Sequence, residues 1–277
     1  MNDDTIKKAV REHYAVVARE GSSCCATSSG AASNCCGLSG LEDIGAAIGY
    51  SKDEMAAVPE GANLGLGCGN PLALSDLKEG ETVVDLGSGA GFDCFLAVRR
   101  VGPSGRVIGV DMTPDMIERA RANARKAGFP NVEFRLGEIE HLPVADNAAG
   151  MIISNCVINL STDKPQVFRE ALRVLKPGGR LMVSDLVLNR PLPASVKESV
   201  EAYAGCISGA MLKEDYLQAM RDAGFKEVEV VAENNYPIGA INPDTSELDA
   251  LAEGLPPEDV AAAADSVVSV KVRAVKQ

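Results

Sequence analysis

The chain has 277 residues, 46% of them hydrophobic, and a formal net charge of −12. These values suit one sizeable buried core with a smaller appended region, and they exclude a uniformly basic face for nucleic acid or for an anionic membrane surface. Residues 1–17 contain no long apolar run, and no segment approaches the roughly 18 apolar residues of a spanning helix. We therefore expect no signal peptide, no membrane partner, no nucleic-acid partner and a cytoplasmic location.

The first elements in chain order are helical. Apolar residues recur at helical spacing over residues 3–20, which predicts an amphipathic helix. Residues 21–40 are rich in Ser, Gly and Cys, and this composition predicts a mobile loop. Two short helices are expected over 41–50 and 51–60, followed by a glycine-rich turn region at 61–71.

From residue 81 the pattern changes to apolar β-branched runs that alternate with helical stretches. The expected strands cover 82–87, 106–111, 132–137, 149–155 and 180–188, and the expected helices cover 91–102, 113–128 and 164–179. Strand–helix alternation with short connections predicts an α/β, Rossmann-like, mostly parallel sheet with helices on both faces. Further along, a helix is expected at 213–224 and strands at 227–233 and 266–276.

The cysteine content is unusual, because the chain has eight cysteines. In a reducing cytosol such a count indicates metal, metalloid or redox chemistry, whereas a secreted domain would use it for disulfides. The alternative for any single cysteine is a small buried apolar residue.

The first chemical motif is VVDLGSGAGFD. Asp85 closes the first strand, and Gly87, Gly89 and Gly91 follow at alternate positions, with Ser88 inside the loop. Glycines let the backbone turn sharply and let a ligand approach closely. Alone, such a loop indicates either a dinucleotide site or only a tight turn.

The second strand narrows this choice. Asp111 stands at its carboxyl end, where an acidic side chain can accept hydrogen bonds from both ribose hydroxyls of a nucleoside. Met112 beside it is a candidate cover for an adenine ring. The alternative role for Asp111 is the N-cap of the helix that starts at Pro114, but Thr113 is better placed for that role.

Glu138 and Ile139 follow the third strand and are candidates for contacts with the edge and the face of an adenine ring. Together with the KPGGRLMVSD turn into the fifth strand, these motifs resemble the Rossmann-like class I S-adenosylmethionine-dependent methyltransferases over residues 81–188. The resemblance implies S-adenosyl-L-methionine as methyl donor, with Asn155 among the cofactor-binding residues. An NAD enzyme would more often show GxGxxG and would need a hydride-transfer site, which we do not find.

Three isolated cysteines stand in unusual contexts. Cys156 follows the fourth strand in MIISNCVINL, at a position where DNA amino-methyltransferases carry an Asn/Asp-Pro-Pro-aromatic motif. Cys68 lies among glycines in GLGCGNP, and Cys206 lies in AYAGCISGAM after the fifth strand. All three segments could reach the reactive end of the cofactor, which suggests a common soft ligand.

The amino-acid sequences of four segments resemble one methyltransferase family more closely. VPEGANLGLGCGNP, DLGSGAGFDCFLA, ISNCVINL and EAYAGCISGAM strongly resemble the arsenite S-adenosylmethionine methyltransferases, and the resemblance extends over nearly the whole chain. It implies that Cys68, Cys156 and Cys206 bind trivalent arsenic, which arrives as arsenite or as its thiol conjugates. Some relatives have an acidic residue just before the last cysteine, whereas this chain has Gly205, so a supporting role for that acid does not carry over.

The resemblance also implies that one N-terminal cysteine takes part in turnover. Cys24 and Cys25 are the better placed candidates, and Cys35 and Cys36 are the others. Each methyl transfer oxidises arsenic from the trivalent to the pentavalent state, so two electrons must be returned. A cysteine of the 21–40 loop could supply them together with Cys68 by forming a disulfide, which a thiol reductant such as glutathione or thioredoxin would reset.

Thiols suit this chemistry because trivalent arsenic is thiophilic, and three sulfur ligands leave its lone pair free to attack a methyl carbon. No general base is needed, because the nucleophile carries no proton. The chain has only two histidines, His13 and His141, and we interpret His141 as structural.

Two other functions stay open at this point. One is a methyltransferase acting on another small molecule, with incidental cysteines. The other is a metal- or metalloid-binding protein that holds zinc or arsenic with its two CC pairs. For the methyltransferase we expect three regions: an N-terminal part with the cysteine loop (1–75), a cofactor-binding domain (76–190) and a C-terminal part that completes the sheet and covers the site (191–277).

Overall fold

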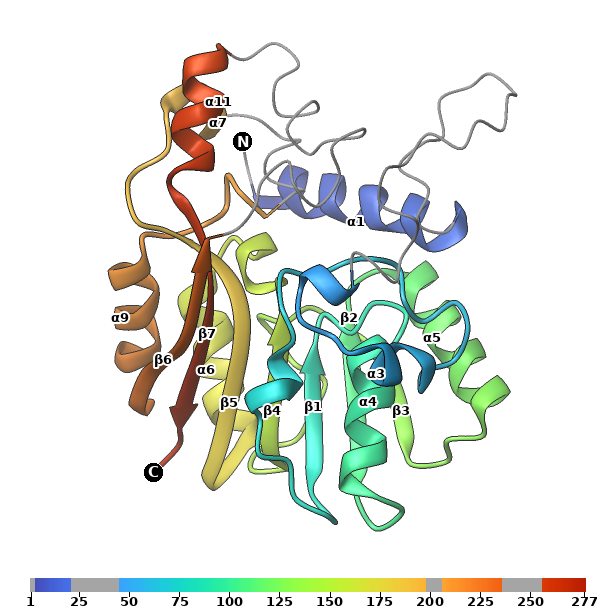
Figure 1. Ribbon diagram of the computed structural model, residues 1–277. Helices are drawn as coiled ribbons and strands as arrows, with labels where there is room; N and C mark the ends of the chain where they lie inside the picture. The colour runs from blue at the N-terminus through green and yellow to red at the C-terminus, as the bar shows by residue number, and fades with distance from the viewer. Residues whose placement is uncertain (1–2, 21–44, 198–205, 236–255) are drawn as a thin grey trace, which may run out of the picture.

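The computed structural model describes residues 3–20, 45–197, 206–235 and 256–277, so the predicted loop at 21–40 lies outside the described residues. Within the described residues the chain forms a seven-stranded sheet (Figure 1). Its strands are β1 (Thr82–Leu86), β2 (Arg106–Asp111), β3 (Val132–Leu136), β4 (Ala149–Asn155), β5 (Leu175–Leu188), β6 (Lys226–Asn235) and β7 (Val267–Val275).

Helices cover both faces and one edge of this sheet (Figure 1). The longer ones are α1 (Asp3–Glu20), α4 (Phe92–Val101), α5 (Pro114–Ala127), α6 (Lys164–Val174), α9 (Lys213–Ala223) and α11 (Pro257–Ala264). The shorter ones are α3 (Lys52–Ala56), α7 (Ala194–Lys197) and the 3-10 turns η1 (Pro71–Leu74) and η2 (Ile158–Leu160). None of the described helices is long and apolar enough to cross a membrane.

The strand order is β3-β2-β1-β4-β5-β7-β6. The first five strands run parallel, and β7 is antiparallel to both of its neighbours, β5 and β6. The predicted α/β architecture with a mostly parallel sheet is therefore confirmed. Because the chain winds outward from β1 in both directions, the carboxyl ends of β1 and β4 flank a topological switch point, where open sheets of this kind bind ligands.

The sheet has a separate apolar core on each face. Val83 of β1 packs with residues of α4 and α5, whereas Val84 and Leu86 pack with residues of α6 and α9. All three side chains have 0% exposure. Burial on both faces explains why β1 is a continuous apolar run rather than an alternating one.

Helix boundaries follow local signals. Asp163 caps α6, because its carboxylate accepts the Gln166 N–H at 3.0 Å. Thr113 is the N-cap residue of α5 and Pro114 follows it, as predicted, although the Thr113 side chain makes no capping bond. Helix α9 ends before Gly224, whose φ of +112° suits glycine.

Three predicted boundaries are wrong. The helix expected to continue through residue 179 ends at Val174, because Pro177 and two glycines cannot prolong it. Strand β5 begins at Leu175 instead of 180, since Leu175 already pairs with Ala149 of β4. Of the helix expected over 41–50, residues 41–44 lie outside the described residues, 45–47 are helical and 48–50 are not; of the helix expected over 51–60, only the five residues of α3 are helical.

Helix α1 lies across the carboxyl edge of the parallel strands (Figure 1). Near its start, Val10 packs in a cluster with Cys68 and Cys206. Near its end, Ala18 packs with Ala90 and Met116. The apolar stripe of this helix therefore covers the edge at which the sequence predicts the functional site.

Candidate functional site

The glycine loop (residues 87–91) joins β1 to α4. It is held by the end of β2, because the N–H groups of Gly87 and Ser88 both donate to the carbonyl of Val110, at 2.8 and 3.0 Å. Gly87 has a φ of +67°, and a Cβ there would lie 2.4 Å from the Val157 side chain. Glycine is thus required at position 87 both by the backbone and by contact with the segment after β4.

Asp111 braces this loop. Its carboxylate accepts the N–H of Gly89 at 2.9 Å and the N–H of Thr113 at 2.8 Å. Burial raises the pKa of Asp111, and these two backbone hydrogen bonds oppose the rise. The remaining lone pairs of the carboxylate stay available for ribose hydroxyls.

Glu138 is engaged by helix α1. Lys7 Nζ lies 2.7 Å from the Glu138 carboxylate and 3.4 Å from that of Glu140, and Arg11 lies 3.9 Å from Glu138. The Lys7 ammonium lowers the pKa of Glu138. The predicted adenine face, Ile139, is 8% exposed and belongs to the main core cluster. These contacts fasten α1 over the predicted nucleoside side of the edge.

The residues around the loop fit S-adenosylmethionine. Among the described residues, the buried Ser88 hydroxyl has no hydrogen-bond partner. A Cβ built on Gly89 would meet nothing within 4 Å. Asp85 is 2% exposed and accepts a bond from the Cys94 thiol at 3.2 Å, and burial raises its pKa well above the ordinary value. An unused polar atom, open space and strand-end acids together match a ligand with a nucleoside and an amino-acid part.

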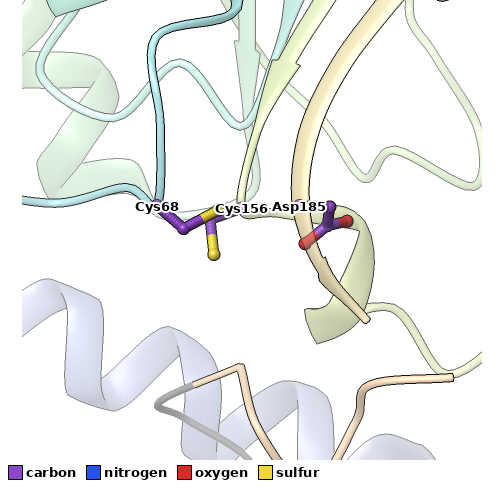
Figure 2. A group of neighbouring side chains, drawn as sticks. All are labelled: Cys68, Cys156 and Asp185. Carbon is purple, nitrogen blue, oxygen red and sulfur yellow. The ribbon is translucent and has the colours of Figure 1, made fainter. Parts of the chain in front are cut away.

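The thiol cluster (Cys68, Cys156 and Cys206) lies at the same edge. Cys68 comes from the turn before η1, and Cys156 directly follows β4 (Figure 2). Cys206 is the first residue of the described segment 206–235, and its thiol donates to the Cys156 carbonyl at 2.9 Å. The Cys156 thiol is hydrogen-bonded to the thiols of both other cysteines. The structure therefore brings together the three predicted cysteines, whereas Cys24, Cys25, Cys35 and Cys36 lie outside the described residues.

Two of these cysteines have an unusual backbone. Cys156 has a φ of +57° and Cys206 a φ of +64°, in the left-handed region that L residues rarely adopt. Residues held in that region cost of order 1–3 kcal/mol and persist only where the surroundings impose them. At Cys156 one such constraint is its N–H, which donates to the carbonyl of Ser184 at 2.8 Å.

The backbone of Cys68 is clamped on both sides. Its N–H donates to Asn155 Oδ1 at 3.1 Å, Asn155 Nδ2 donates to the Gly69 carbonyl at 2.8 Å, and the Ser269 hydroxyl donates to the Cys68 carbonyl at 2.8 Å. The flanking glycines permit this approach. A Cβ at Gly67 would lie 2.8 Å from Asn155, and one at Gly69 would lie 2.1 Å from the Ser184 hydroxyl. Asn155, which we predicted at the cofactor, thus contacts the thiol-bearing turn.

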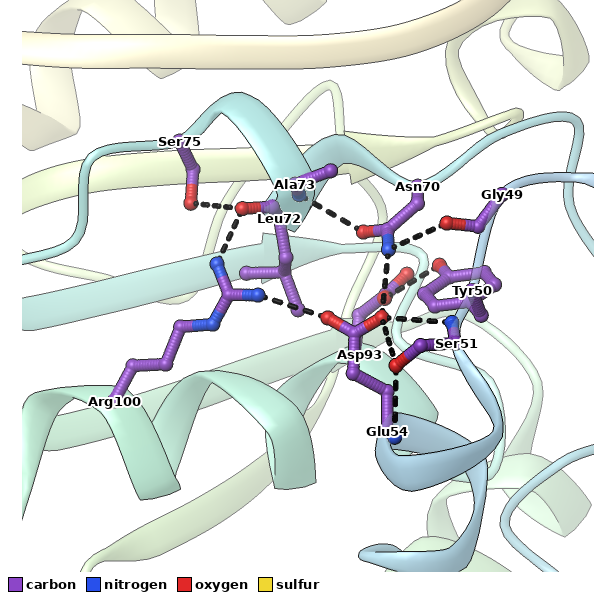
Figure 3. A network of polar contacts seen from close by, with 10 residues as sticks. All are labelled: Gly49, Tyr50, Ser51, Glu54, Asn70, Leu72, Ala73, Ser75, Asp93 and Arg100. Atoms are coloured by element: carbon purple, nitrogen blue, oxygen red, sulfur yellow. Dashed lines mark hydrogen bonds and ion pairs between the residues drawn. The ribbon is translucent and has the colours of Figure 1, made fainter.

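A polar network anchors this turn to the core (Figure 3). Tyr50 donates to Asp93 of α4 at 2.6 Å, and Asn155 donates to the Tyr50 hydroxyl at 2.9 Å. Glu54 accepts from Asn70 at 3.3 Å, and Arg100 of α4 lies 2.9 Å from Glu54. Burial raises the pKa of Asp93 to about 6, although the hydrogen bonds from Tyr50 and Asn155 lower it.

Asp185 is the site residue that sequence reasoning missed. It lies on β5 with 0% exposure, and its carboxylate reaches to within 4.8 Å of the Cys68 and Cys156 sulfur atoms (Figure 2). Asn159 and Tyr216 donate to it at 2.9 and 3.0 Å. The available signal was an acid inside the apolar run LMVSDLVL, since a carboxylate is rarely buried without a purpose.

Burial also sets the charge of the thiols. It raises the pKa of Cys68, and at Cys156 the hydrogen bonds from the two neighbouring thiols raise the pKa first, with burial added. Two cations stand close by: Lys271 beside Cys68, and Lys164 beside Asp185 and Cys206. Cys68 and Cys156 are therefore neutral thiols at neutral pH, and positive charge lies at the border of the cluster.

Comparisons with known proteins agree with this geometry. A family model described as "Methyltransferase domain" matches residues 77–224. A solved arsenic(III) S-adenosylmethionine methyltransferase from Chlamydomonas reinhardtii is 33% identical, with a TM-score of 0.62, over 83% of this chain and 72% of that one. This chain belongs to the arsenite methyltransferase family.

Curated members of that family extend the comparison. The arsenite methyltransferase of Halobacterium salinarum is 49% identical over 81% of this chain and 58% of its own length. The human arsenite methyltransferase is 37% identical over 61% of this chain and 47% of its own length. The chain thus spans about half the length of the curated arsenite methyltransferases that it matches.

Proposed function

We propose that this chain is an S-adenosylmethionine-dependent arsenite methyltransferase. The observation that carries the proposal is the convergence of the Cys68, Cys156 and Cys206 thiols at the carboxyl edge of β4, beside the glycine loop. The names of the relatives in the arsenite methyltransferase family support the same substrate.

S-adenosylmethionine would be held along the carboxyl ends of β1 to β4. The residues assigned to it are Asp85, Gly87, Ser88, Gly89, Gly91, Asp111, Met112, Glu138, Ile139 and Asn155. When bound, this cofactor supplies an electrophilic methyl group. Asp111 both fixes the loop through Gly89 and offers its free lone pairs to the ribose. Val157, which packs against Gly87, connects the loop to the thiol cluster.

Arsenite would be held by the thiol cluster. Arsenous acid is neutral at pH 7, and so are the buried thiols of Cys68 and Cys156. Each thiol can replace one hydroxyl of arsenous acid, so that a sulfur–arsenic bond forms and one water leaves. No net charge develops at a buried site, and burial of a lone charge is the costly event in such a place.

The protein then contributes position rather than acid–base catalysis. Three sulfurs leave one lone pair on arsenic, and this lone pair is the nucleophile. Asn155 fixes the turn that carries Cys68 and directly precedes Cys156, so it sets the relation between two of the three sulfurs. Such fixed geometry lowers the entropic part of a barrier.

Methyl transfer raises arsenic from the trivalent to the pentavalent state, and two electrons must return it. We propose that Cys68 and one N-terminal cysteine supply these electrons by forming a disulfide. The preferred candidates for the N-terminal partner are Cys24 and Cys25, and the others are Cys35 and Cys36. Glutathione or thioredoxin would then reduce the disulfide. Detoxification of arsenite is the cellular role that this chemistry serves.

The three-region division belongs to the same proposal. Residues 1–75 would contribute the cysteine loop and Cys68, residues 76–190 the cofactor site, and residues 191–277 the cover with Cys206. Strands β6 and β7 extend the sheet beyond β5, and α7 and α11 lie together at the carboxyl edge, which suits that assignment (Figure 1).

The test is to incubate the purified chain with arsenite, S-adenosylmethionine and a thiol reductant, and to separate arsenic species by chromatography with elemental detection. Methylated arsenic should form and should be lost in Cys156→Ser. Cys94→Ser is the matched control, because Cys94 is a buried free cysteine that is bonded to Asp85 outside the thiol cluster. Absence of methylated arsenic while calorimetry shows bound S-adenosylmethionine would refute arsenite as the substrate and favour another small molecule.

A further inference from the structure

The proposed arsenic site contains a fourth donor group, the Asp185 carboxylate, beside the three cysteine thiols. The atoms that converge within 4.8 Å of one another are the sulfurs of Cys68 and Cys156 and a carboxylate oxygen of Asp185 (Figure 2). Cys206 is absent from this set, since its thiol is turned to the carbonyl oxygen of Cys156. Two overlapping donor sets therefore share Cys68 and Cys156, one completed by sulfur and the other by oxygen.

We propose that Cys68, Cys156 and Asp185 form a binding site for a divalent cation of the zinc class, which competes with arsenite for the two shared thiols. This inference goes beyond the proposed function, because it needs the thiols but not the methyl transfer. Zinc accepts mixed thiolate and carboxylate ligands, and three protein donors with a water in the fourth position are a common arrangement.

The donor geometry is within reach of such an ion. Zinc holds thiolate sulfur at about 2.3 Å and carboxylate oxygen at about 2.1 Å, which places tetrahedral donors roughly 3.5 Å apart. Because the three donor atoms already lie within 4.8 Å of one another, they need to approach by little more than about an ångström at most. The Tyr216 hydroxyl occupies one side of Asp185 Oδ2 at 3.0 Å, which leaves the other lone pair of that oxygen for the cation.

Charge and second-shell contacts also suit a cation. Two thiolates and one carboxylate exceed the charge of a divalent ion by one, and the ammonium groups of Lys271 and Lys164 stand beside Cys68 and Asp185. The buried Ser184 hydroxyl lies at the Cys68 thiol, and a hydrogen bond from it favours the thiolate form of Cys68. Asn159 and Leu186 hold the Asp185 carboxylate in place from the other oxygen.

Arsenic and zinc should therefore depend on different third ligands. Trivalent arsenic needs the sulfur of Cys206 and gains nothing from Asp185, because carboxylate oxygen is a poor partner for a thiophilic centre. Zinc needs the oxygen of Asp185, and a water can fill its fourth position without Cys206. A pair of substitutions should separate the two ligands in opposite directions.

The experiment uses the full chain with Cys24, Cys25, Cys35 and Cys36 replaced by Ser, so that the CC pairs cannot bind metal. Zinc chloride and arsenite are titrated separately into the reduced protein, zinc by competition with a chromophoric indicator and arsenite by calorimetry. We expect one zinc per chain. Asp185→Asn should weaken zinc binding at least about tenfold and leave arsenite binding within about threefold, whereas Cys206→Ser should do the reverse.

Retained arsenite binding in Asp185→Asn is the evidence that this variant is folded. As a second measurement that needs no substitution at Asp185, cobalt(II) bound to the four-serine protein should show tetrahedral bands with charge transfer from two thiolates, unchanged in Cys206→Ser. Zinc binding that ignores Asp185→Asn, zinc binding lost in Cys206→Ser, a three-thiolate cobalt spectrum or no zinc at all would each overturn the inference. Zinc binding together with no arsenite methylation by the unsubstituted chain would instead refute the proposed function and leave this inference standing.

Discussion

The two halves of the candidate site are assembled in different ways. The cofactor half consists of strand ends and the loops that follow them, and its glycine loop is braced by Asp111 of the adjacent strand. The thiol half joins Cys68, Cys156, Asp185 and Cys206, which come from separate elements. A local motif can specify the first half, whereas the second exists only after the sheet has formed. The halves meet where Val157 packs against Gly87.

The sharpest way to separate the halves is Cys156→Ser. Cys156 contacts both other thiols, so its loss leaves no three-sulfur site. We expect arsenite methylation to fall by at least about a hundredfold, because the nucleophile is no longer held. S-adenosylmethionine affinity, measured by calorimetry, should change less than about twofold, as it should in the control Cys94→Ser. A parallel loss of cofactor binding would mean that the two halves are not independent.

Gly87→Ala should damage both halves together. The new methyl group would lie 2.4 Å from the Val157 side chain, and the φ of +67° disfavours alanine. We expect S-adenosylmethionine affinity and arsenite methylation each to fall by about thirtyfold, or about 2 kcal/mol. Gly178→Ala is the control, because Gly178 has a φ of +76° with nothing within 4 Å. It should cost stability in a thermal melt but leave both functions intact.

The network behind the thiol turn should give a pH signature of similar size. Burial raises the Asp93 pKa to about 6 in the folded protein, above the ordinary value of 3.8. A carboxyl whose pKa is raised by folding stabilises the fold fully below its unfolded pKa, and this contribution is lost as pH rises through the folded pKa. Between pH 4 and 6 it should decline by on the order of 2 kcal/mol.

Urea unfolding of the wild type and of Asp93→Asn across pH 4–8 measures this contribution. The difference between their unfolding free energies should change across pH 4–6 and stay level above it. A constant difference would show that Asp93 does not titrate in that window.

Asn155→Ala tests whether the thiol half depends on the clamp at Cys68. The variant loses the bonds to the Cys68 N–H and the Gly69 carbonyl, so the turn is no longer fixed. We expect arsenite affinity, measured by calorimetry, to fall about tenfold. Asn131→Ala is the matched control, since Asn131 clamps the carbonyls of Gly102 and Gly105 at 3.0 and 2.9 Å away from the site. Cofactor binding lost with arsenite binding unchanged would place Asn155 in the cofactor half only.

The smallest effect is expected at helix α1, which lies over the cofactor half. Lys7→Met removes the ion pair of α1 with Glu138, and such partly exposed pairs contribute at most about 1 kcal/mol. S-adenosylmethionine affinity should fall by about threefold at low salt, and the deficit should shrink at high salt. Lys8→Met is the control, because Lys8 is 75% exposed and lies 3.8 Å from Glu12 of the same helix. An equal loss of S-adenosylmethionine affinity in both variants would disprove a role for the Lys7–Glu138 ion pair in cofactor binding.

The periodicity of the sequence determined the framework of this protein. Alternating apolar strands and amphipathic helices predicted the parallel sheet, and the motifs after β1, β2 and β3 predicted the nucleoside edge, because strand ends and adjacent loops are local in sequence. The resemblance to arsenite methyltransferases added the three cysteines as one set. The boundaries at residues 174–180 could not be predicted, since pairing of Leu175 with β4 depends on a distant strand.

Only the tertiary structure decided what surrounds the thiols. Asp185 reads in the sequence as one acid in an apolar strand, and its closeness to Cys68 arises from pairing of β5 with β4. The clamp of Asn155 on Cys68 joins residues 87 positions apart. Contacts of this kind leave no periodic trace, because they depend on how elements pack rather than on how each element forms. Local sequence therefore determined which chemical groups the site contains, and the packing of the fold determined how they are arranged.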